Sequence, residues 1–215
     1  MENTQEQTIA KNKILSGKLK DKLKDRIWRL NHLYYFLDDD NNKLQFKLRP
    51  IQKLLLKHIW FLNVILKARQ LGVTTFFCIF FLDECLFNGV ECALIAHTEV
   101  AAKLIFEKKI KYAWDNLEDF IKEQYELKTD TKHELCFNLK SNNRESRIYV
   151  STTLRSGTVQ RLHISELSTI DQMFPIKAGE IKSGALNMVH SKQIVTIEST
   201  ARVAAEYLGI YANCQ

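Results

Sequence analysis

The chain has 215 residues, of which 46% are hydrophobic and 26% charged, and its net charge at pH 7 is +6. This length and composition are typical of one globular domain with a substantial core, and they exclude a disordered or fibrous chain. The apolar run of residues 76–87 is interrupted by Asp83 and Glu84, and the N-terminus has no apolar core. We therefore expect neither a membrane span nor a signal peptide.

Most of the positive charge lies near the N-terminus, because residues 11–29 carry eight lysines and arginines and only two aspartates. Apolar residues recur at helical spacing over residues 14–37, which predicts an amphipathic helix with a lysine-rich face. We expect residues 1–44 to form a basic N-terminal helical segment and residues 45–215 to form the main domain. The lysine-rich face either contacts phosphates or an acidic partner, or is simply solvated.

Beyond this segment the chain alternates between predicted strands and predicted helices. Residues 38–42 are a turn-forming cluster, and Pro50 suits the first turn of a second helix. We then expect a buried strand at residues 61–68, further strands at 91–98, 159–165 and 192–198, a hairpin of 133–139 with 146–152, and helices at 73–87, 99–116 and near 175–189. This order predicts an α/β fold with a mainly parallel sheet and helices on both faces.

Three other features are expected to be structural. The five cysteines form no Cys-x-x-Cys pair, so we expect reduced thiols in a cytosolic protein and no zinc site. The stretch FFCIFFL, residues 76–82, is expected to be a helix buried against the sheet. His163, on a predicted strand, is expected to be a core or hydrogen-bonded histidine rather than a ligand.

The stretch KARQLGVTT, residues 67–75, lies between a predicted strand and a predicted helix, as a phosphate-binding loop does. In the usual pattern, G-x-x-x-x-G-K-[ST], Gly72 matches the second glycine and Thr74 the hydroxyl on the magnesium side. Val73 stands in place of the lysine, and Lys67 stands in place of the first glycine. Free N–H groups and the helix dipole favour an anion there, although an ordinary strand-to-helix turn has the same outline.

Two more predicted strands end in polar residues. Residues 161–168, RLHISELS, deliver Ser165 and Glu166, where a nucleotide hydrolase has a magnesium ligand and a carboxylate that activates water. Residues 194–200, IVTIEST, end in Glu198–Thr200, which alone would indicate a strand end and a helix cap. Because the carboxyl ends of parallel strands meet at one edge of a sheet, we expect all three strand ends to lie together.

In this order and spacing, KARQLGVTT, LIAHT, RSGTVQRLHISELS and TIEST resemble the ATPase domain of phage terminase large subunits, the DNA-packaging motors. The resemblance covers about residues 45–205. It implies a P-loop NTPase fold of the ASCE, RecA-like class, preceded by the N-terminal helical segment. It also implies a Walker A loop at residues 67–75, a Walker B strand ending at Glu166, and ATP bound with Mg²⁺.

The resemblance assigns roles to single residues. Glu166 would be the catalytic glutamate and Arg69 an arginine finger on the γ-phosphate. Gln52 would recognise adenine, and Lys67 would act as a Walker A lysine that is placed early. Thr74 and Ser165 would hold magnesium, with Ser165 in place of the more usual aspartate. The residues expected to bind ATP are Gln52, Lys67, Ala68, Arg69, Gln70, Leu71, Gly72, Val73, Thr74 and Thr75, and those expected to couple hydrolysis to movement are Glu198, Ser199 and Thr200.

The resemblance further implies an ATPase that drives double-stranded DNA into a procapsid in the cytoplasm of a bacterial host. Its partners would be the portal protein and the small terminase subunit, with a ring of identical subunits on the portal and a monomer in isolation. No nuclease activity is expected, because the sequence ends at Gln215, before the nuclease of the family. The alternatives are a truncated prophage remnant that binds nucleotide, DNA or a packaging partner without significant turnover, or another nucleic-acid-stimulated, helicase-like ATPase.

Overall fold

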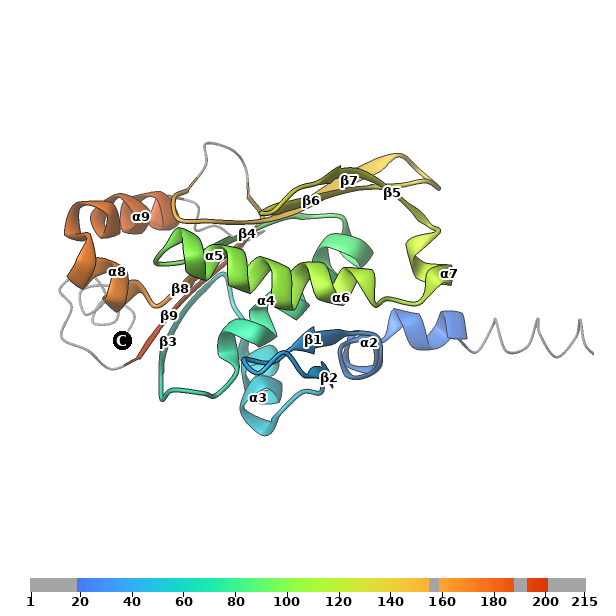
Figure 1. Cartoon of the computed structure of the whole chain (residues 1–215), viewed down its shortest axis with the longest axis horizontal. Coiled ribbons are helices and arrows are strands. Elements are labelled where there is room, and N and C mark those ends of the chain that lie inside the picture. Colours follow the sequence, from blue (N-terminus) through green and yellow to red (C-terminus); the bar gives the residue numbers. More distant parts are fainter. Residues whose placement is uncertain (1–18, 155–158, 188–192, 201–215) are drawn as a thin grey trace, which may run out of the picture.

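A seven-stranded sheet forms the centre of the computed structural model, which describes residues 19–154, 159–187 and 193–200 (Figure 1). The strands follow the order β3-β9-β8-β4-β7-β6-β5. They are β3 (Leu62–Lys67), β4 (Glu91–Ile95), β5 (Tyr125–Asp130), β6 (Glu134–Leu139), β7 (Arg144–Ser151), β8 (Arg161–Ser165) and β9 (Ile194–Thr200). Neighbours are parallel from β3 to β7, whereas β6 is antiparallel to both β7 and β5. The predicted α/β fold with a mainly parallel sheet is confirmed.

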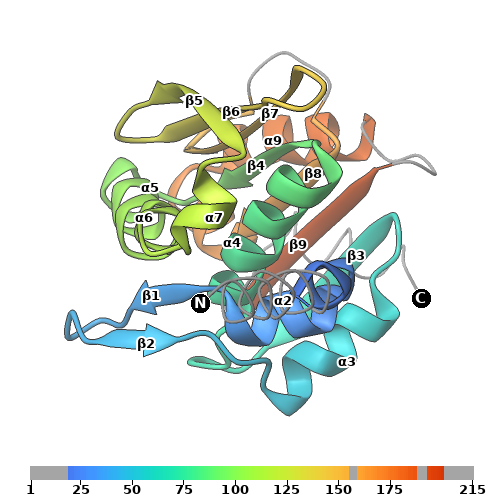
Figure 2. The ribbon, with the colours of Figure 1, turned by 90° about the vertical axis from the view of Figure 1, so that its right-hand side faces the viewer.

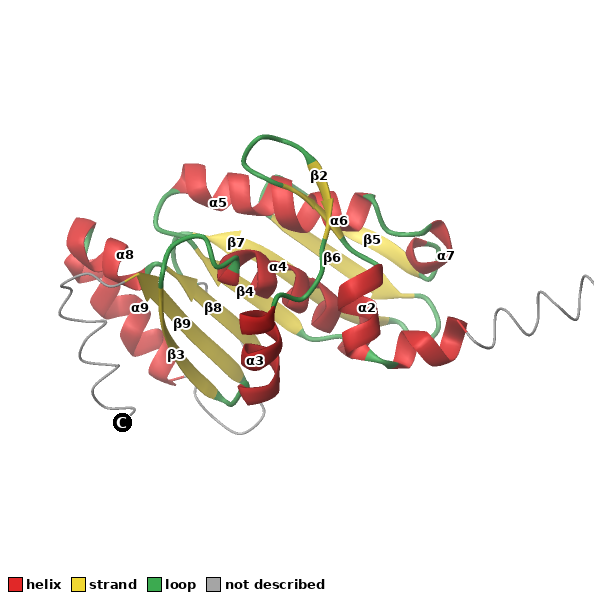
Figure 3. Ribbon diagram, turned by 90° about the horizontal axis from the view of Figure 1, so that it is seen from below, coloured by secondary structure: helices red, strands yellow, loops and turns green. Residues whose placement is uncertain are grey.

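Helices cover both faces of the sheet, as the sequence predicts (Figures 2 and 3). They are α2 (Arg26–His32), α3 (Pro50–His58), α4 (Val73–Asp83), α5 (Glu99–Ile105), α6 (Tyr112–Asp115), α7 (Asp119–Lys122), α8 (Leu167–Met173) and α9 (Pro175–Asn187), with π-helical turns η1 (Glu84–Asn88) and η2 (Phe106–Lys111). Along β4, Cys92 and Leu94 belong to the core beneath α4, while Ala93 and Ile95 belong to the core beneath α8 and α9. Alternate side chains of a strand point to opposite faces, so each face has its own core.

Helix α4 is apolar all round and is enclosed accordingly. Its residues from Thr75 to Asp83 are all buried, between the sheet and α2 (Figure 3). Although α4 is strongly apolar, no helix in the described part of the chain is long and apolar enough to cross a membrane. The helices predicted at residues 73–87 and 99–116 are confirmed, each with a π-helical turn. Strand β5 and the short helices α7 and α8 are not predicted by the patterns above.

Strand β3 is less buried than predicted. The apolar sequence of residues 62–67 favours a strand covered on both faces, but β3 is at the edge of the sheet and pairs only with β9. Its residues are therefore only partly buried, and Leu66 is 50% exposed. Hydrophobicity along one segment does not specify the position of that segment in the strand order, and this explains the difference.

The prediction of a single helix over residues 14–37 is wrong in its described part. Residues 19–24 are helical, but the helix is interrupted at Asp25 and a separate helix, α2, begins. The Asp25 carboxylate accepts hydrogen bonds from the backbone N–H groups of Ile27 (2.8 Å) and Trp28 (3.3 Å). Aspartate is a favourable N-cap, so it starts a new helix where the apolar spacing alone would continue the old one.

Residues 35–45 form an antiparallel hairpin instead of the end of that helix. Strand β1 (Tyr35–Leu37) pairs with β2 (Lys43–Gln45), and the turn predicted at residues 38–42 joins them. Aromatic residues favour strands, and the turn-forming cluster lets the chain fold back. The second predicted helix is confirmed as α3, which begins at Pro50.

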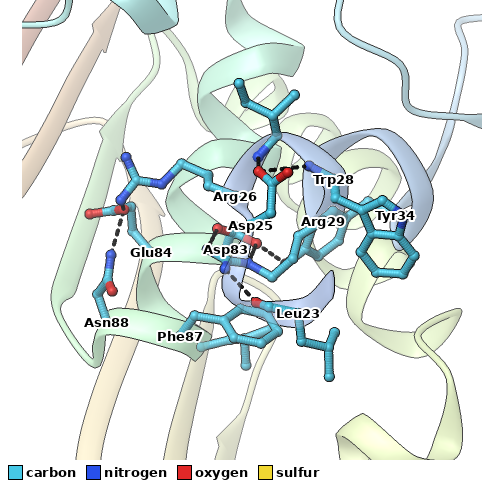
Figure 4. Close-up of polar contacts among 12 residues, drawn as sticks. Leu23, Asp25, Arg26, Trp28, Arg29, Tyr34, Asp83, Glu84, Phe87 and Asn88 are labelled. Atoms are coloured by element: carbon cyan, nitrogen blue, oxygen red, sulfur yellow. Dashed lines mark hydrogen bonds and ion pairs between the residues drawn. The ribbon is translucent and has the colours of Figure 1, made fainter. Parts of the chain in front are cut away.

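Helix α2 is fixed to the C-terminal end of α4 by a buried ion pair (Figure 4). The Arg29 guanidinium donates to both carboxylate oxygens of Asp83, at 2.8 and 2.7 Å, and the Tyr34 hydroxyl donates to Asp83 at 2.7 Å. Leu30 and Tyr34 are fully buried in the same core as α4. The polypeptide from Arg29 to Tyr34 is therefore part of the main core.

A second carboxylate lies beside the first. Glu84, 1% exposed, forms an ion pair with Arg26 (2.6 Å) and accepts a hydrogen bond from Asn88 (2.7 Å) (Figure 4). It forms a second ion pair with Arg161, at 2.8 Å. Because Arg161 begins β8, these contacts lie at the end of the sheet opposite to Ser165. We call the whole group the anchor cluster: Arg26, Arg29, Tyr34, Asp83, Glu84 and Arg161.

Candidate nucleotide-binding site

Three strand ends with polar residues lie side by side, because β9 pairs with β3 on one side and with β8 on the other. In the parallel register Lys67 lies opposite Thr200, and Ser165 lies opposite Glu198. Glu166 follows β8 directly and caps the next helix, α8. The predicted meeting of the three strand ends at one edge of the sheet is confirmed.

The loop after β3 turns into α4 at Gly72. This residue has φ 70°, in the left-handed region that favours glycine, and it is the N-cap of α4. Glycine has no side chain to cap the helix, so the N–H groups of its first turn remain available to a ligand. Val73 is 1% exposed and packs in the core, as expected if Lys67 rather than this position serves the loop.

Gln52 and Arg49 hold this loop from the side of α3. The Gln52 side chain is buried and donates to the Gly72 carbonyl at 2.9 Å, while its own oxygen accepts from the Arg49 N–H at 3.0 Å. The Arg49 guanidinium also donates to the Gln70 carbonyl at 3.4 Å. A Cβ at position 72 would lie 3.0 Å from Gln52 Nε2, so the close approach also favours glycine. The contact of Gln52 is thus with the loop, and its role toward adenine stays a prediction.

Lys67 and Glu166 face each other across the strand ends. Lys67 Nζ lies 3.0 Å from Glu166 Oε1 and 3.6 Å from Glu198 Oε2, and the lysine side chain is only 10% exposed. The other oxygen of Glu166 accepts hydrogen bonds from Thr200, at 3.2 Å from the backbone N–H and 3.0 Å from the hydroxyl. Two carboxylates therefore share one lysine, and Thr200 holds the more exposed of them in place.

Glu198 is a fully buried carboxylate at the centre of the site. Its Oε1 accepts hydrogen bonds from the hydroxyls of Thr74 (2.6 Å) and Ser165 (3.0 Å), and His163 Nε2 lies 3.4 Å away. Burial alone would raise the pKa of this carboxyl, but His163, Lys67 and Thr74 outweigh burial and lower its pKa to about 2. Glu198 therefore carries a full negative charge at neutral pH.

His163 is a core histidine, as predicted. It is fully buried and stacks on Phe77 with ring centroids 4.4 Å apart. Its contact with Glu198 is not predicted by the sequence, because it depends on the register between β8 and β9. Ser199, assigned to coupling, points away from these groups: its hydroxyl contacts the hydroxyl of Ser168 and accepts from the Ser168 N–H at 3.2 Å. Ser168 has no motif that would single it out.

Arg69 is not brought to the other site residues. It lies on the exposed part of the loop, together with Ala68 and Gln70. In residues 19–154, 159–187 and 193–200 it has no hydrogen bond or ion pair. Its role as an arginine finger therefore stays a prediction.

A cavity of about 660 Å³ adjoins the loop. Its volume falls within the range of about 300–1,000 Å³ that is usual for small-molecule sites. Of the predicted residues, Gln52, Lys67, Gln70 and Gly72–Thr75 line it. It is also lined by residues that the sequence does not predict: Phe36–Asp39, Leu44–Lys47, Arg49 and Lys109. The hairpin residues among them are not predicted, since the apolar spacing favours a helix through Leu37 and no strand is predicted at residues 43–45.

The oxygen groups beside Lys67 suit a hard divalent cation. Thr74 and Ser165 hydroxyls lie 3.4 Å apart, and both donate to the ionised Glu198. Magnesium prefers oxygen ligands from a few protein groups together with phosphate oxygens. Glu198 Oε2 is buried and accepts no hydrogen bond from the described residues, so part of its capacity is unused. These groups fit the cation that the sequence predicts.

The parallel sheet, the strand–loop–helix at residues 67–75 and the adjacent strand ends form an α/β fold of the P-loop ATPase type. No family model and no curated protein matches the sequence. Among solved structures, the large terminase ATPase domain of Thermus phage P74-26 is similar, with TM-score 0.59 and 15% identity over 77% of this chain and 70% of that chain.

Two further structures are similar to the chain. A mutant of the same Thermus phage domain gives TM-score 0.60 at 14% identity over 77% of this chain and 70% of that chain. The HK97 bacteriophage large terminase gives TM-score 0.60 at 15% identity, over 90% of this chain and 40% of that chain. At these identities the likeness shows the fold: it is that of phage large terminase ATPase domains, as the sequence motifs predict.

Proposed function

We propose that the chain is the ATPase module of a phage DNA-packaging terminase, which hydrolyses ATP with Mg²⁺ to move double-stranded DNA into a procapsid. One observation carries the proposal: Lys67, at the start of a phosphate-loop turn, lies 3.0 Å from Glu166 at the end of β8. A cation for phosphate and a carboxylate for water are thus adjacent, at the edge of a parallel sheet where ligands bind. The fold shared with terminase ATPase domains supports the same reading.

The ion pair suggests how binding prepares catalysis. Phosphates over the loop attract Lys67 and the N–H groups of the first turn of α4, so Lys67 shifts from Glu166 toward the nucleotide. The Glu166 carboxylate, still held by Thr200, is then free to accept a proton from the attacking water. Thr74 and Ser165 would hold the Mg²⁺ that accompanies ATP, and this cation would neutralise part of the phosphate charge. Glu166 therefore becomes an active base only when nucleotide has drawn Lys67 away from it.

The test is ATP hydrolysis by the purified chain, with and without double-stranded DNA. Glu166→Gln should keep ATP binding within a few-fold and lose hydrolysis by roughly 10²–10⁴-fold, the usual contribution of a general base. Glu145→Gln makes the same change at an exposed carboxylate at the start of β7 and should leave both values unchanged. Equal hydrolysis by wild type and Glu166→Gln would contradict the assignment of Glu166.

A second reading, a protein that binds nucleotide without significant turnover, is favoured by the exposure of Arg69, which forms no hydrogen bond or ion pair with the other described site residues. An arginine finger contributes about 10³–10⁵ in kcat in well-studied phosphoryl transfer. We therefore expect slow turnover by the isolated chain and faster turnover when a ring neighbour or a partner directs Arg69 to the phosphate. ATP binding with no hydrolysis under any condition, portal protein and DNA included, would establish the non-catalytic reading instead.

The proposed partners are double-stranded DNA, the portal protein, the small terminase subunit and further copies of this chain in a ring, with a monomer in isolation. DNA contact is supported by the exposed lysines Lys20, Lys22 and Lys24 before α2. Lysines that neutralise phosphates release counterions, so DNA affinity should fall with salt. The site of action that follows from this role is the cytoplasm of a bacterial host.

A further inference from the structure

The last residue of β8, Ser165, offers the candidate magnesium position a hydroxyl in place of a carboxylate, and the Glu166 carboxylate that follows it is paired with Lys67. The nearest acidic group of β9 lies directly beside Ser165, because this residue pairs with Glu198 in the parallel register. Ser165 Oγ donates to Glu198 Oε1 at 3.0 Å. The negative charge beside Ser165 is therefore supplied by Glu198 on β9, the strand that lies between β8 and β3.

The second hydroxyl of the site converges on the same oxygen. Thr74 Oγ1, in the first turn of α4, donates to Glu198 Oε1 at 2.6 Å. A hydroxyl that donates its single hydrogen keeps its lone pairs for another partner. Both hydroxyl hydrogens thus point toward Glu198, and the lone pairs of the two oxygens remain able to bind a cation. A residue that does not touch a metal often orients the metal's ligands by hydrogen bonds of this kind.

Glu198 also has capacity that its present contacts do not use. The residue is 0% exposed, yet its Oε2 accepts no hydrogen bond from the described residues, and Lys67 Nζ lies 3.6 Å away. A buried polar atom without a hydrogen bond calls for a functional explanation. The charge that remains here faces Lys67, the residue that we propose moves to the phosphates.

We propose that Glu198 is the carboxylate of the magnesium site, a positioning residue that acts on the cation through the Thr74 and Ser165 hydroxyls. This inference rests on the proposed ATPase function and adds a role that Ser165 alone does not fill. When Lys67 moves to the phosphates, Glu198 loses the cation nearest to its Oε2, and the divalent cation replaces that positive charge. A nucleotide without the metal meets the same negative charge and is repelled.

The competing explanation is that Glu198 only neutralises Lys67 and His163 and keeps the strand ends packed. The two roles differ in a measurable way. A structural carboxylate affects ATP affinity equally with and without Mg²⁺, since the fold is the same in both conditions. A carboxylate of the metal site changes the difference between the two conditions, because its removal lowers ATP affinity in Mg²⁺ but does not lower it in EDTA.

The experiment measures ATP affinity by titration calorimetry in excess Mg²⁺ and in EDTA, and Mn²⁺ affinity in the presence of ATP by electron paramagnetic resonance. For Glu198→Gln we expect the Mg²⁺-dependent gain in ATP affinity and the Mn²⁺ affinity to fall by roughly 10–100-fold. Affinity in EDTA should be unchanged or higher. The control, Glu84→Gln, removes a buried carboxylate of the anchor cluster; it should lower the melting temperature and leave the Mg²⁺-dependent gain intact.

A rescue variant separates charge placement from packing. In Ser165→Asp combined with Glu198→Gln, the carboxylate returns to β8, opposite its former position in the register. We expect this double variant to recover most of the Mg²⁺-dependent gain that Glu198→Gln loses. A Glu198→Gln protein that keeps the full gain, or loses affinity equally in Mg²⁺ and EDTA, would overturn the inference, and so would a double variant without recovery.

Two further outcomes are informative. If Glu198→Gln does not fold, Glu198→Asp keeps the charge but withdraws it from both hydroxyls; the gain should then fall about tenfold or more, and an unchanged gain overturns the inference. If the wild-type chain binds no ATP with or without Mg²⁺, the proposed function fails and the inference fails with it. Wild-type binding with an unaltered gain in Glu198→Gln overturns the inference alone.

Discussion

The two ends of the sheet both contain buried carboxylates, but the partners of these carboxylates differ. In the anchor cluster, Asp83 receives two bonds from the rigid guanidinium of Arg29 and a third from Tyr34. At the other end, Glu198 and Glu166 share the single flexible ammonium of Lys67, with hydroxyls supplying the rest. Bidentate arginine fixes geometry, whereas a lysine on a flexible stem can leave. The basic residue that pairs with each carboxylate, arginine or lysine, therefore distinguishes the stabilising cluster from the candidate site better than the carboxylate itself does.

Helix α4 connects these two ends. Its first turn, at Val73 and Thr74, belongs to the candidate site, and its last residue, Asp83, belongs to the anchor cluster. Between them, residues 75–82 are buried and mostly apolar, with Phe77 stacked on His163 and the Arg26 guanidinium over the Phe80 ring. The anchor cluster thus fixes the C-terminal end of α4, and the N-terminal end of the same helix presents backbone N–H groups to a ligand. If the two ends of α4 act independently, substitutions in the anchor cluster change stability and substitutions in the candidate site change ligand binding.

The largest expected effect is on stability, at the anchor cluster. Arg29→Ala leaves Asp83 buried with Tyr34 as its one hydrogen-bond donor among the described side chains, and removal of one member of a buried ion pair usually costs about 3–5 kcal/mol. Urea denaturation followed by circular dichroism measures this loss. Asp21→Ala breaks the exposed pair of Asp21 and Lys24 in the same segment and should change stability by less than about 1 kcal/mol. Similar losses for both variants would contradict a special role of the anchor cluster.

The next effect is the pH dependence of stability due to Glu198. Its folded pKa of about 2 lies below the ordinary value of 4.5, so the charged form is favoured by folding. The resulting stabilisation is present above about pH 4.5, fades as the pH falls toward 2, and amounts to about 3 kcal/mol from a shift of this size.

Unfolding free energies of wild type and Glu198→Gln, measured from pH 6 downward, test this expectation. The difference between them should be largest above pH 5 and should narrow steadily on acidification. The unfolding free energy of the control Glu145→Gln, at an exposed position, should follow that of wild type at every pH. A constant difference between wild type and Glu198→Gln would mean that the charge of Glu198 is not what stabilises the strand ends.

A smaller effect is expected on ligand binding at Lys67. Lys67→Ala removes a charge-assisted contact to phosphate and should weaken ATP binding by roughly 1.5–3 kcal/mol. Because Val73 is buried but lines the cavity, Val73→Lys in the Lys67→Ala background should recover part of the loss. Titration calorimetry measures both. Unchanged affinity in Lys67→Ala, with binding abolished in Arg69→Ala, would show that Arg69 alone supplies the charge.

The sequence predicts the fold and the meeting of the strand ends because both follow from local patterns. Alternating apolar segments specify the sheet, and the polar residues after each strand specify its functional edge. The contact of Glu198 with Ser165 and Thr74 is not predictable in this way, since it depends on strand order and register across separate segments. The hairpin at residues 35–45 is missed for a different reason: the apolar spacing that ends at Leu37 fits a helix, and its partner strand β2 has only three residues, too few to show a pattern.

The smallest effect on stability is expected at the exposed lysines before α2. A deletion through Arg29 cannot test their role in DNA binding, because it would also remove part of the anchor cluster. Replacing Lys20, Lys22 and Lys24 together by glutamine avoids this problem, since all three are exposed. Stability should change by less than about 0.5 kcal/mol for each position.

The readout is the salt dependence of double-stranded DNA binding. Each lost phosphate contact lowers the slope of log K against log salt by about 0.9, so the triple variant should lose up to about three such steps. A matched variant replaces three exposed lysines of other elements, Lys103, Lys128 and Lys132, and lowers the net charge equally. If both variants flatten the slope alike, only the total charge matters. If the slope decreases more in the Lys20, Lys22 and Lys24 variant than in the matched variant, the DNA binds beside α2, near the C-terminal end of α4. The anchor cluster that stabilises the fold and the DNA contact then lie at the same end of the molecule.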